Sequence, residues 1–330
     1  MSLISKPGQG WRRALLCTAL LAALAACGGS TSQRDPFVAQ RLFALGDEAS
    51  ALLINPADPT SNTAALKYSV NVDVGVSPAV KIDCAQQPLW TQSLAALYGF
   101  TFKECNPGNV AVPLAATFAK LGAKVADVEA QAALAGGFRE KDLVTVLLGS
   151  NDVLEAYRAL IDSNGTITED QLTGELRARA ETLANKINQI VGQGARVIVS
   201  TLPDLGLSPF ARAEEAVGAG RAALLSRMTI AFNEQLGIKI LLDGSLIGLV
   251  QADQMVQAMV RSPGSFGITN PYDAVCLPAS PLPTCTTKAQ SLIVGGDPGT
   301  FLWADGTRMS FGGQSYLGRL ALDRANRNPF

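Results

Sequence analysis

The sequence predicts an α/β fold in which a parallel sheet lies between two layers of helices. Three short apolar runs, 42–45, 143–148 and 196–202, have the length and continuous hydrophobicity of strands that are buried on both faces. Longer segments with apolar residues at helical spacing lie between them. Because strands and helices alternate, we predict a three-layer α/β/α architecture with four to five parallel strands and right-handed crossovers.

The composition suits a single folded domain and limits its chemistry. The 330 residues are 48% hydrophobic and 17% charged, which is ample for a full core. The formal net charge is −1 without any block of like charge, so we expect no nucleic-acid partner. The sequence contains no histidine. This removes the commonest general base and the commonest metal ligand, and we expect neither a metal nor a cofactor.

The N-terminus has the features of a secretory signal. An apolar run over 14–26 follows three basic residues, Lys6, Arg12 and Arg13. The run has about 13 residues, whereas about 20 are needed to span a bilayer. It ends in Leu-Ala-Ala followed by Cys27 and Gly28, which resembles the signal of bacterial lipoproteins. An ordinary cleaved signal with small residues before the cut is the alternative.

The lipoprotein resemblance implies a signal peptide over 1–26, a lipidated Cys27 and a tether over 27–36. Several acyl chains on one cysteine are enough for stable membrane anchoring. The resemblance also implies that Gly28, the residue after the cysteine, is not a signal for retention in the inner membrane. We therefore expect a cell-envelope protein at the bacterial outer membrane. A single folded domain is expected over 37–330.

Four further cysteines indicate disulfides: Cys84, Cys105, Cys276 and Cys285. In an oxidising compartment they allow three pairings, of which we predict the local one, Cys84–Cys105 with Cys276–Cys285. These bonds close loops of about 20 and about 10 residues, and each stabilises the fold by roughly 2–3 kcal/mol. Four buried thiols are the alternative. No cysteine spacing indicates a metal site.

The first strand, over 42–45, is followed by a long segment without helical periodicity. Residues 55–115 are rich in Pro, Asn, Asp and Gly and contain the first cysteine pair. We predict an ordered, disulfide-stapled excursion there, with a short helix over 89–98. Small and apolar residues at helical spacing around Gly122 predict a helical segment over 115–135.

The second half alternates strands and helices. Thr168 and Gln171 form a capping box that starts an amphipathic helix running to about 191, where glycines end it. The other elements predicted here are strands over 143–148, 196–202 and 246–250, helices over 212–237 and 255–260, and a last helix that Ser310 caps and that ends near 324.

Four polar blocks lie just after predicted strands or ahead of helices, where parallel sheets place their chemical groups. In chain order they are Gly46-Asp47-Glu48, the segment around Gly122, Gly149-Ser150-Asn151-Asp152 and Asp305-Gly306-Thr307-Arg308. With Thr201-Leu202-Pro203-Asp204-Leu205-Gly206 between the last two, the series resembles the GDSL-type, or SGNH, esterase and lipase family over nearly the whole mature chain. The resemblance implies an SGNH-hydrolase-like, flavodoxin-like sheet.

The resemblance also implies a role for each block. In that family the first block carries the nucleophilic serine, a glycine and an asparagine help to bind the oxyanion, and the last block is Asp-x-x-His. Asn151 and a backbone N–H near Gly122 match the oxyanion positions, and Asp305 matches the aspartate that orients the histidine. The two positions that make and break bonds differ, because Glu48 stands at the serine position and Arg308 at the histidine position.

These two replacements argue against the family's chemistry. Acyl transfer through this site needs a hydroxyl nucleophile and a base poised near neutral pH. Arg308 stays protonated at any biological pH, and Glu48 would be a poor nucleophile towards an ester. Ser50, two residues beyond Glu48, is rotated about 200° away on a helix, and Ser150 has no base. A glycosidase-like carboxylate pair is also disfavoured, because an arginine between carboxylates holds them ionised.

The two replacements instead suggest a charge pair. In the family fold the replaced side chains face each other, so we predict a bidentate Glu48–Arg308 ion pair with Asp305 on the other side of the guanidinium. The alternative is an unused cleft in which Arg308 points to the solvent.

Three functional hypotheses follow. The first is a catalytically impaired SGNH-like envelope lipoprotein, a pseudo-hydrolase with no active catalytic residues. The second is an active ester or lipid hydrolase that works by another arrangement, and the third is a structural or partner-binding lipoprotein. The expected partners are the membrane, through Cys27, and a small acyl or glycan ligand in the cleft.

Overall fold

The computed structural model describes residues 37–327. The expected signal peptide over 1–26, the lipidation site Cys27 and the tether over 27–36 lie outside the described residues, as does the end of the chain at 328–330. Within the described range, no helix combines the length and the hydropathy that crossing a bilayer requires.

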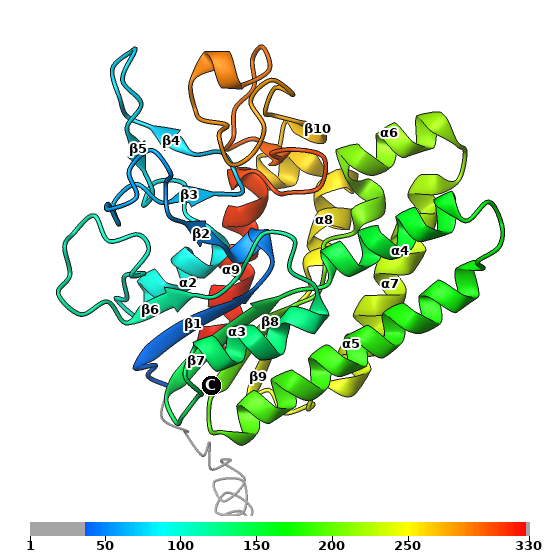
Figure 1. Ribbon diagram of the computed structural model, residues 1–330, viewed down its shortest axis with the longest axis horizontal. Helices are drawn as coiled ribbons and strands as arrows, with labels where there is room; N and C mark the ends of the chain where they lie inside the picture. Colours follow the sequence, from blue (N-terminus) through cyan, green and yellow to red (C-terminus); the bar gives the residue numbers. More distant parts are fainter. Residues whose placement is uncertain (1–36, 328–330) are drawn as a thin grey trace, which may run out of the picture. The chain divides into compact units, whose positions relative to one another are not determined.

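A five-stranded parallel sheet forms the centre of the fold (Figure 1). In spatial order its strands are β6 (Ala115–Thr117), β1 (Arg41–Gly46), β7 (Asp142–Leu147), β8 (Arg196–Ser200) and β9 (Ile247–Val250). All neighbouring pairs run parallel. The predicted α/β class and parallel sheet are therefore confirmed, with the strand order of flavodoxin-like folds.

Strands β1 and β7 pair over six residues each, from Arg41 opposite Asp142 to Gly46 opposite Leu147. All six residues of β7 are buried, as continuous apolar runs predict for strands covered on both faces. The guanidinium of Arg41 donates two hydrogen bonds, of 2.8 and 2.6 Å, to the Asp142 carboxylate. This pair fixes the register at the start of both strands.

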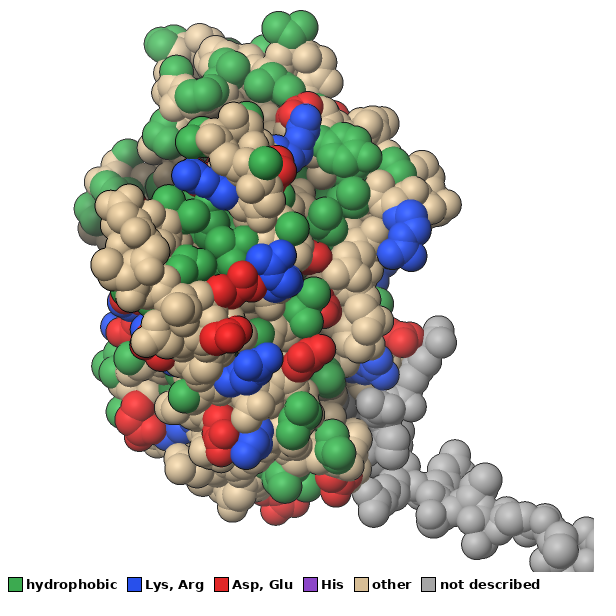
Figure 2. All heavy atoms as spheres, turned by 90° about the vertical axis from the view of Figure 1, so that its right-hand side faces the viewer, with side chains coloured by type: hydrophobic (Ala, Val, Ile, Leu, Met, Phe, Trp, Pro, Cys, Tyr) green, Lys and Arg blue, Asp and Glu red, His purple; other side chains and the backbone are tan. Residues whose placement is uncertain are grey.

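Helices cover both faces of the sheet (Figure 1). They are α2 (Trp90–Leu97), α3 (Val128–Leu134), α4 (Ser150–Asp162), α5 (Glu169–Gly192), α6 (Pro209–Val217), α7 (Arg221–Lys239), α8 (Ala252–Arg261) and α9 (Phe311–Arg327). Helices α3, α5 and α7 pack on one face, whereas α2 and α9 pack together on the other. On the outer side of α4 to α7, acidic and basic side chains alternate (Figure 2), and pairs such as Arg227 with Glu169 join neighbouring helices.

Several shorter elements lie outside the central sheet. The two-stranded pairs are β2 (Leu52–Leu53) with β3 (Leu66–Lys67), β4 (Val72–Asp73) with β5 (Ile82–Asp83), and β10 (Asn270–Ala274) with β11 (Phe301–Trp303). The 3-10 turns are η1 (Glu48–Ser50), η2 (Val125–Asp127), η3 (Leu205–Leu207), η4 (Pro263–Phe266) and η5 (Ala289–Ser291).

The excursion over 55–115 is ordered, as predicted. Disulfides join Cys84 to Cys105 and Cys276 to Cys285, which is the predicted local pairing. The predicted short helix is α2.

Lys67 anchors the excursion in a way that the sequence does not reveal. Its side chain is fully buried, and Nζ donates hydrogen bonds to the backbone carbonyls of Cys84, Gln86 and Gln87 at 3.3, 2.6 and 3.0 Å. Burial lowers the pKa of Lys67 to about 7, although the nearby Asp83 carboxylate opposes the shift. Three ammonium hydrogens facing three carbonyl oxygens satisfy the buried group completely.

The structure differs from the predicted helices in four details. The segment 115–135 begins with strand β6 and becomes α-helical only in α3, because Ala-Ala-Thr is too short and too small-chained to show a strand pattern. The predicted helix over 212–237 is divided into α6 and α7 at Gly218–Gly220. Helix α4 was missed. The Ser310 hydroxyl donates to the Pro298 carbonyl oxygen at 2.9 Å instead of capping α9.

The exit of β1 is tightly constrained. Gly46 has a φ of 141°, and a Cβ there would overlap the carbonyl oxygen of Leu147. The buried side-chain amide of Gln131 makes two hydrogen bonds to Gly46. Its oxygen accepts from the Gly46 N–H at 2.7 Å, and its nitrogen donates to the Gly46 carbonyl oxygen at 2.8 Å. Connections from β1 and β7 leave in opposite directions, so the crevice beyond their ends is the topological switch point of the sheet.

Candidate active site

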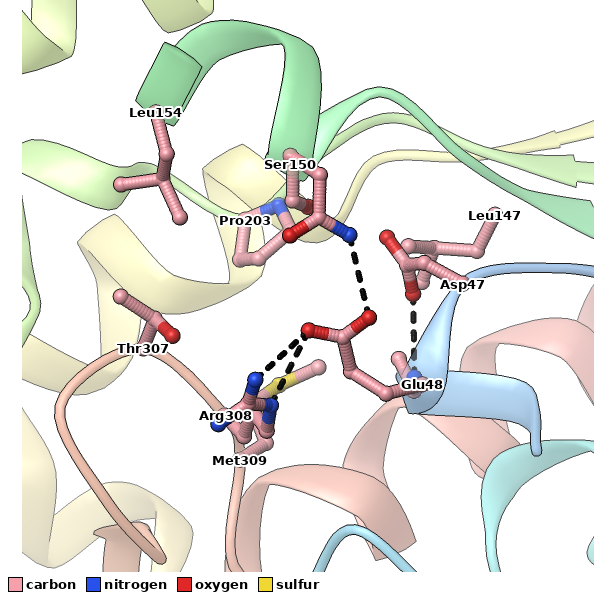
Figure 3. A pocket seen from close by; sticks show the side chains of 11 residues that line it. Asp47, Glu48, Leu147, Ser150, Leu154, Pro203, Thr307, Arg308 and Met309 are labelled. Atoms are coloured by element: carbon pink, nitrogen blue, oxygen red, sulfur yellow. Dashed lines mark hydrogen bonds and ion pairs between the residues drawn. The ribbon is translucent and has the colours of Figure 1, made fainter. Parts of the chain in front are cut away.

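The four predicted polar blocks meet at this switch point. Figure 3 shows residues of three of them, and the Gly122 segment joins them through a hydrogen bond to Glu48. Asp47 and Glu48 follow β1, and Gly122 lies in the loop between β6 and η2. Asn151 lies in the first turn of α4, directly after β7. The turn between β11 and α9 contributes Arg308. The structure therefore brings together the residues that the sequence singled out.

Glu48 forms the predicted ion pair. Its side chain is 8% exposed, and its Oε1 accepts hydrogen bonds from Arg308 Nε at 3.1 Å and from Nη2 at 2.9 Å. Both guanidinium nitrogens therefore reach the same oxygen. The predicted arrangement, in which each nitrogen faces a different carboxylate oxygen, is wrong because the second oxygen is occupied by other donors.

Those donors are the two groups that match the family's oxyanion site. Oε2 of Glu48 accepts a hydrogen bond from the backbone N–H of Gly122 and another from Asn151 Nδ2, each at 3.0 Å. The carboxylate is thus hydrogen-bonded through both oxygens, and its bonds to Asn151 and Arg308 are drawn in Figure 3.

Arg308 is held between two carboxylates, as predicted. Oδ1 of Asp305 accepts from the backbone N–H groups of Thr307 and Arg308, and Oδ2 accepts from Arg308 Nη1 at 2.6 Å. Burial lowers the pKa of Arg308, but the Asp305 and Glu48 carboxylates outweigh it, so the net shift is upward. The guanidinium also lies over the Tyr68 ring, with its central carbon 5.3 Å from the ring centroid.

Asp47 is a second buried carboxyl group beside Glu48. Its Oδ1 accepts from the Ala49 N–H at 3.0 Å and so caps η1, whereas Oδ2 is buried and has no hydrogen-bond partner among the described residues. Burial, and secondarily the Glu48 carboxylate, raises the pKa of Asp47 well above its usual value. Burial and the neighbouring carboxylate therefore both disfavour ionisation of Asp47.

The cavity that remains is very small. Its volume is about 30 Å³, and Ser150, Pro203 and Thr307 line it together with Glu48 and Arg308. This volume is about that of one water molecule, whereas pockets that hold organic ligands have roughly 300–1,000 Å³. In this conformation the site is filled by its own side chains.

The two serines that the sequence offered as substitutes occupy different positions. Ser50 is fully buried, and its Oγ accepts from Trp90 Nε1 at 3.0 Å, so it faces the core. Ser150 lines the cavity. Gln131 and Tyr68 also contact residues of the site, and no sequence motif marks either of them. Over residues 37–327, no group of three or more His, Cys, Asp or Glu residues is placed to hold a metal ion.

Comparison with known families identifies the family of the chain. The sequence profile of the family described as GDSL-like Lipase/Acylhydrolase matches residues 61–240, more than half of the chain. The chain belongs to this family. The matched region contains the two oxyanion-type donors, Gly122 and Asn151, whereas Glu48 and Arg308 lie outside it.

Individual relatives are distant. The chain is 29% identical over 141 residues to a phosphatidylcholine-sterol acyltransferase from Aeromonas hydrophila, a match that spans 42% of this chain and 37% of that protein. Among solved structures, an acetylxylan esterase from Geobacillus stearothermophilus is 14% identical, with a TM-score of 0.41 and coverage of 88% of this chain and 96% of that one. A protein from Parabacteroides merdae described as a GDSL-like lipase is 12% identical, with a TM-score of 0.41 and coverage of 88% and 98%.

The raised pKa of Asp47 predicts a pH dependence of stability. A carboxyl group whose pKa is raised by folding contributes stability that is fully present below its unfolded value, 3.8, and is lost as the pH rises through the folded pKa. An asparagine side chain at this position would carry no charge at any pH. We therefore expect Asp47→Asn to lose less unfolding free energy than the wild type as the pH rises from about 4.

Urea denaturation at a series of pH values tests this expectation. Asp162→Asn, a substitution of an exposed carboxylate at the end of α4, is the matched control and should follow the wild-type curve. Parallel curves for Asp47→Asn and the wild type would contradict the assignment of a raised pKa to Asp47.

Proposed function

We propose that this protein is a catalytically silent member of the GDSL-like family, in which Glu48 and Arg308 replace the nucleophile and the base. The observation that carries the proposal is the position of the Glu48 carboxylate. One of its oxygens accepts from the Gly122 N–H and from the Asn151 amide. The place where a substrate carbonyl would develop negative charge is thus filled by the protein's own side chain.

Neither replacement supports acyl transfer. The guanidinium of Arg308 has a pKa raised by its two carboxylate neighbours against the effect of burial, so it cannot accept a proton. Attack of the Glu48 carboxylate on an ester would give a mixed anhydride, and both oxygens of that carboxylate are already bonded. Loss of triad members costs several orders of magnitude in rate in related chemistry.

A second candidate, ester hydrolysis through another serine, is favoured by one observation. Ser150 lines the same cavity as Asp47, whose raised pKa makes it a better base than an ordinary aspartate. We rank this candidate lower, because Glu48 occupies the donors that would stabilise the oxyanion and because the cavity has room for about one water. A small acyl or glycan ligand in the cleft stays a prediction, since it requires the side chains to move.

The silent-site proposal predicts no turnover of a short-chain aryl ester above the buffer rate. The double variant Glu48→Ser with Arg308→His should gain measurable hydrolysis, because Asp305 and both oxyanion-type donors remain in place. Each single variant should stay near background. The measurement is the initial rate of release of the aryl alcohol by purified protein.

Matched variants decide between the candidates. Adding Asn151→Ala to the double variant should lower its kcat by about 10²–10³-fold, the usual effect of removing one oxyanion donor. Wild-type turnover that is abolished by Glu48→Ala or Arg308→Ala would overturn the proposal. Wild-type turnover abolished by Ser150→Ala would favour the second candidate.

We also propose that the protein is a lipoprotein of the cell envelope, anchored at the bacterial outer membrane through lipidated Cys27. The basic, apolar and small residues that precede this cysteine support the proposal. A structural or partner-binding role there is compatible with a silent site. Cys27→Ser should move the protein from the membrane fraction of bacterial cells to the soluble fraction, and a variant that stays with the membrane would contradict lipid anchoring.

A further inference from the structure

Glu48 has the shape of a serine that carries an acyl group. In an acylated serine, the chain from Cβ continues through Oγ to a carbonyl carbon with its oxygen. In glutamate it continues through Cγ to Cδ, which carries two oxygens. The Glu48 side chain therefore has as many bonds between Cβ and its terminal oxygens as the ester has between Cβ and its carbonyl oxygen.

The contacts of Glu48 follow this correspondence. Oε2 takes the position of the acyl carbonyl oxygen, because the Gly122 N–H and Asn151 Nδ2 each donate to it at 3.0 Å. Oε1 faces the side chain at the histidine position, since Arg308 donates to it through Nε and Nη2. In the planar ester of an acylated serine, the first carbon of the acyl chain would stand where Oε1 stands.

The donors are held in place by groups other than Glu48. The loop before Gly122 is fixed by the Lys120 N–H, which donates to the Gly46 carbonyl at 3.1 Å. Asn151 Nδ2 donates a second hydrogen bond to the Ala123 carbonyl at 3.1 Å. Asp305 holds Arg308 independently through Nη1. The four N–H groups thus form a preorganised cradle for a carboxylate, which we call the anion cradle.

We propose that Glu48 is a built-in mimic of the acylated nucleophile, and that the anion cradle binds a small free monocarboxylate when this side chain is shortened. This inference rests on the proposed function. It explains the lack of catalysis by a side chain that fills the site while the hydrogen-bond donors stay in place. Neutral groups of the same shape fit less well, since one guanidinium and two further N–H donors face the two oxygens and no acceptor does.

The substitution Glu48→Ala tests the proposal directly, because the carbon and oxygen atoms that it deletes are those of an acetate ion. The variant leaves four N–H groups of the cradle without a partner, so we expect it to melt at a lower temperature than the wild type. Acetate should restore stability in a saturable manner, with Tm rising by about 2 °C for each tenfold increase in concentration above the dissociation constant.

Three controls separate a specific site from a salt effect. Acetamide and sodium chloride at equal concentrations should not reproduce the acetate effect in Glu48→Ala. Acetate should leave the wild type and Glu140→Ala, a change at an exposed glutamate, without a saturable rise. Adding Asn151→Ala to Glu48→Ala should weaken acetate binding by at least about tenfold, because a hydrogen bond to a charged group is lost.

Every outcome decides the question. A saturable rise that is confined to Glu48→Ala and reduced by Asn151→Ala supports the proposal, and an equal response in the wild type, or none in the variant, overturns it. If Glu48→Ala is unfolded in plain buffer, refolding in acetate but not in sodium chloride supports the proposal, and failure in both overturns it. Ester turnover by the wild type would overturn the silent-site proposal alone, because the acetate response is measured without a substrate.

Discussion

The structure at the end of the sheet depends on one buried carboxylate. Glu48 accepts four hydrogen bonds, two on each oxygen, from three segments that are distant in sequence. These segments are the loop at Gly122, the first turn of α4 and the turn before α9. A charge in this position is stabilising only while its partners are present, since a buried charge that loses its partner costs several kcal/mol. The interaction thus connects the sheet to the elements on both of its sides.

Two neighbouring carboxyl groups, Asp47 and Asp305, lie in different surroundings near Glu48. Asp47 follows the same strand, and burial and the Glu48 carboxylate raise its pKa, so a second negative charge next to Glu48 is disfavoured. Asp305 on the far side of Arg308 is less buried and holds the guanidinium in position. The positions of these residues resemble those of a catalytic centre, whereas their side chains form a network of ion pairs.

The sequence predicted most of the fold and part of this network. Strands β1, β7 and β8 were predictable because both of their faces are buried, which leaves continuous apolar runs. Strand β6 was not, since three small residues at an edge have no periodicity. The Glu48–Arg308 pair was predictable because the resemblance to the family implies that these two positions face each other. The bonds to Gly122 and Asn151 were not, because they depend on how far a glutamate side chain reaches beyond the position of a serine hydroxyl.

The backbone N–H of Gly122 reports on whether the Glu48 carboxylate reaches the two oxyanion-type donors. The residue itself is exposed, so its amide hydrogen would exchange rapidly with solvent unless the carboxylate holds it. Hydrogen exchange of this amide can be followed by NMR in the wild-type protein. We predict strong protection from exchange at Gly122. Exchange at the rate of an unbonded glycine amide would show that the carboxylate lies elsewhere and would contradict the account.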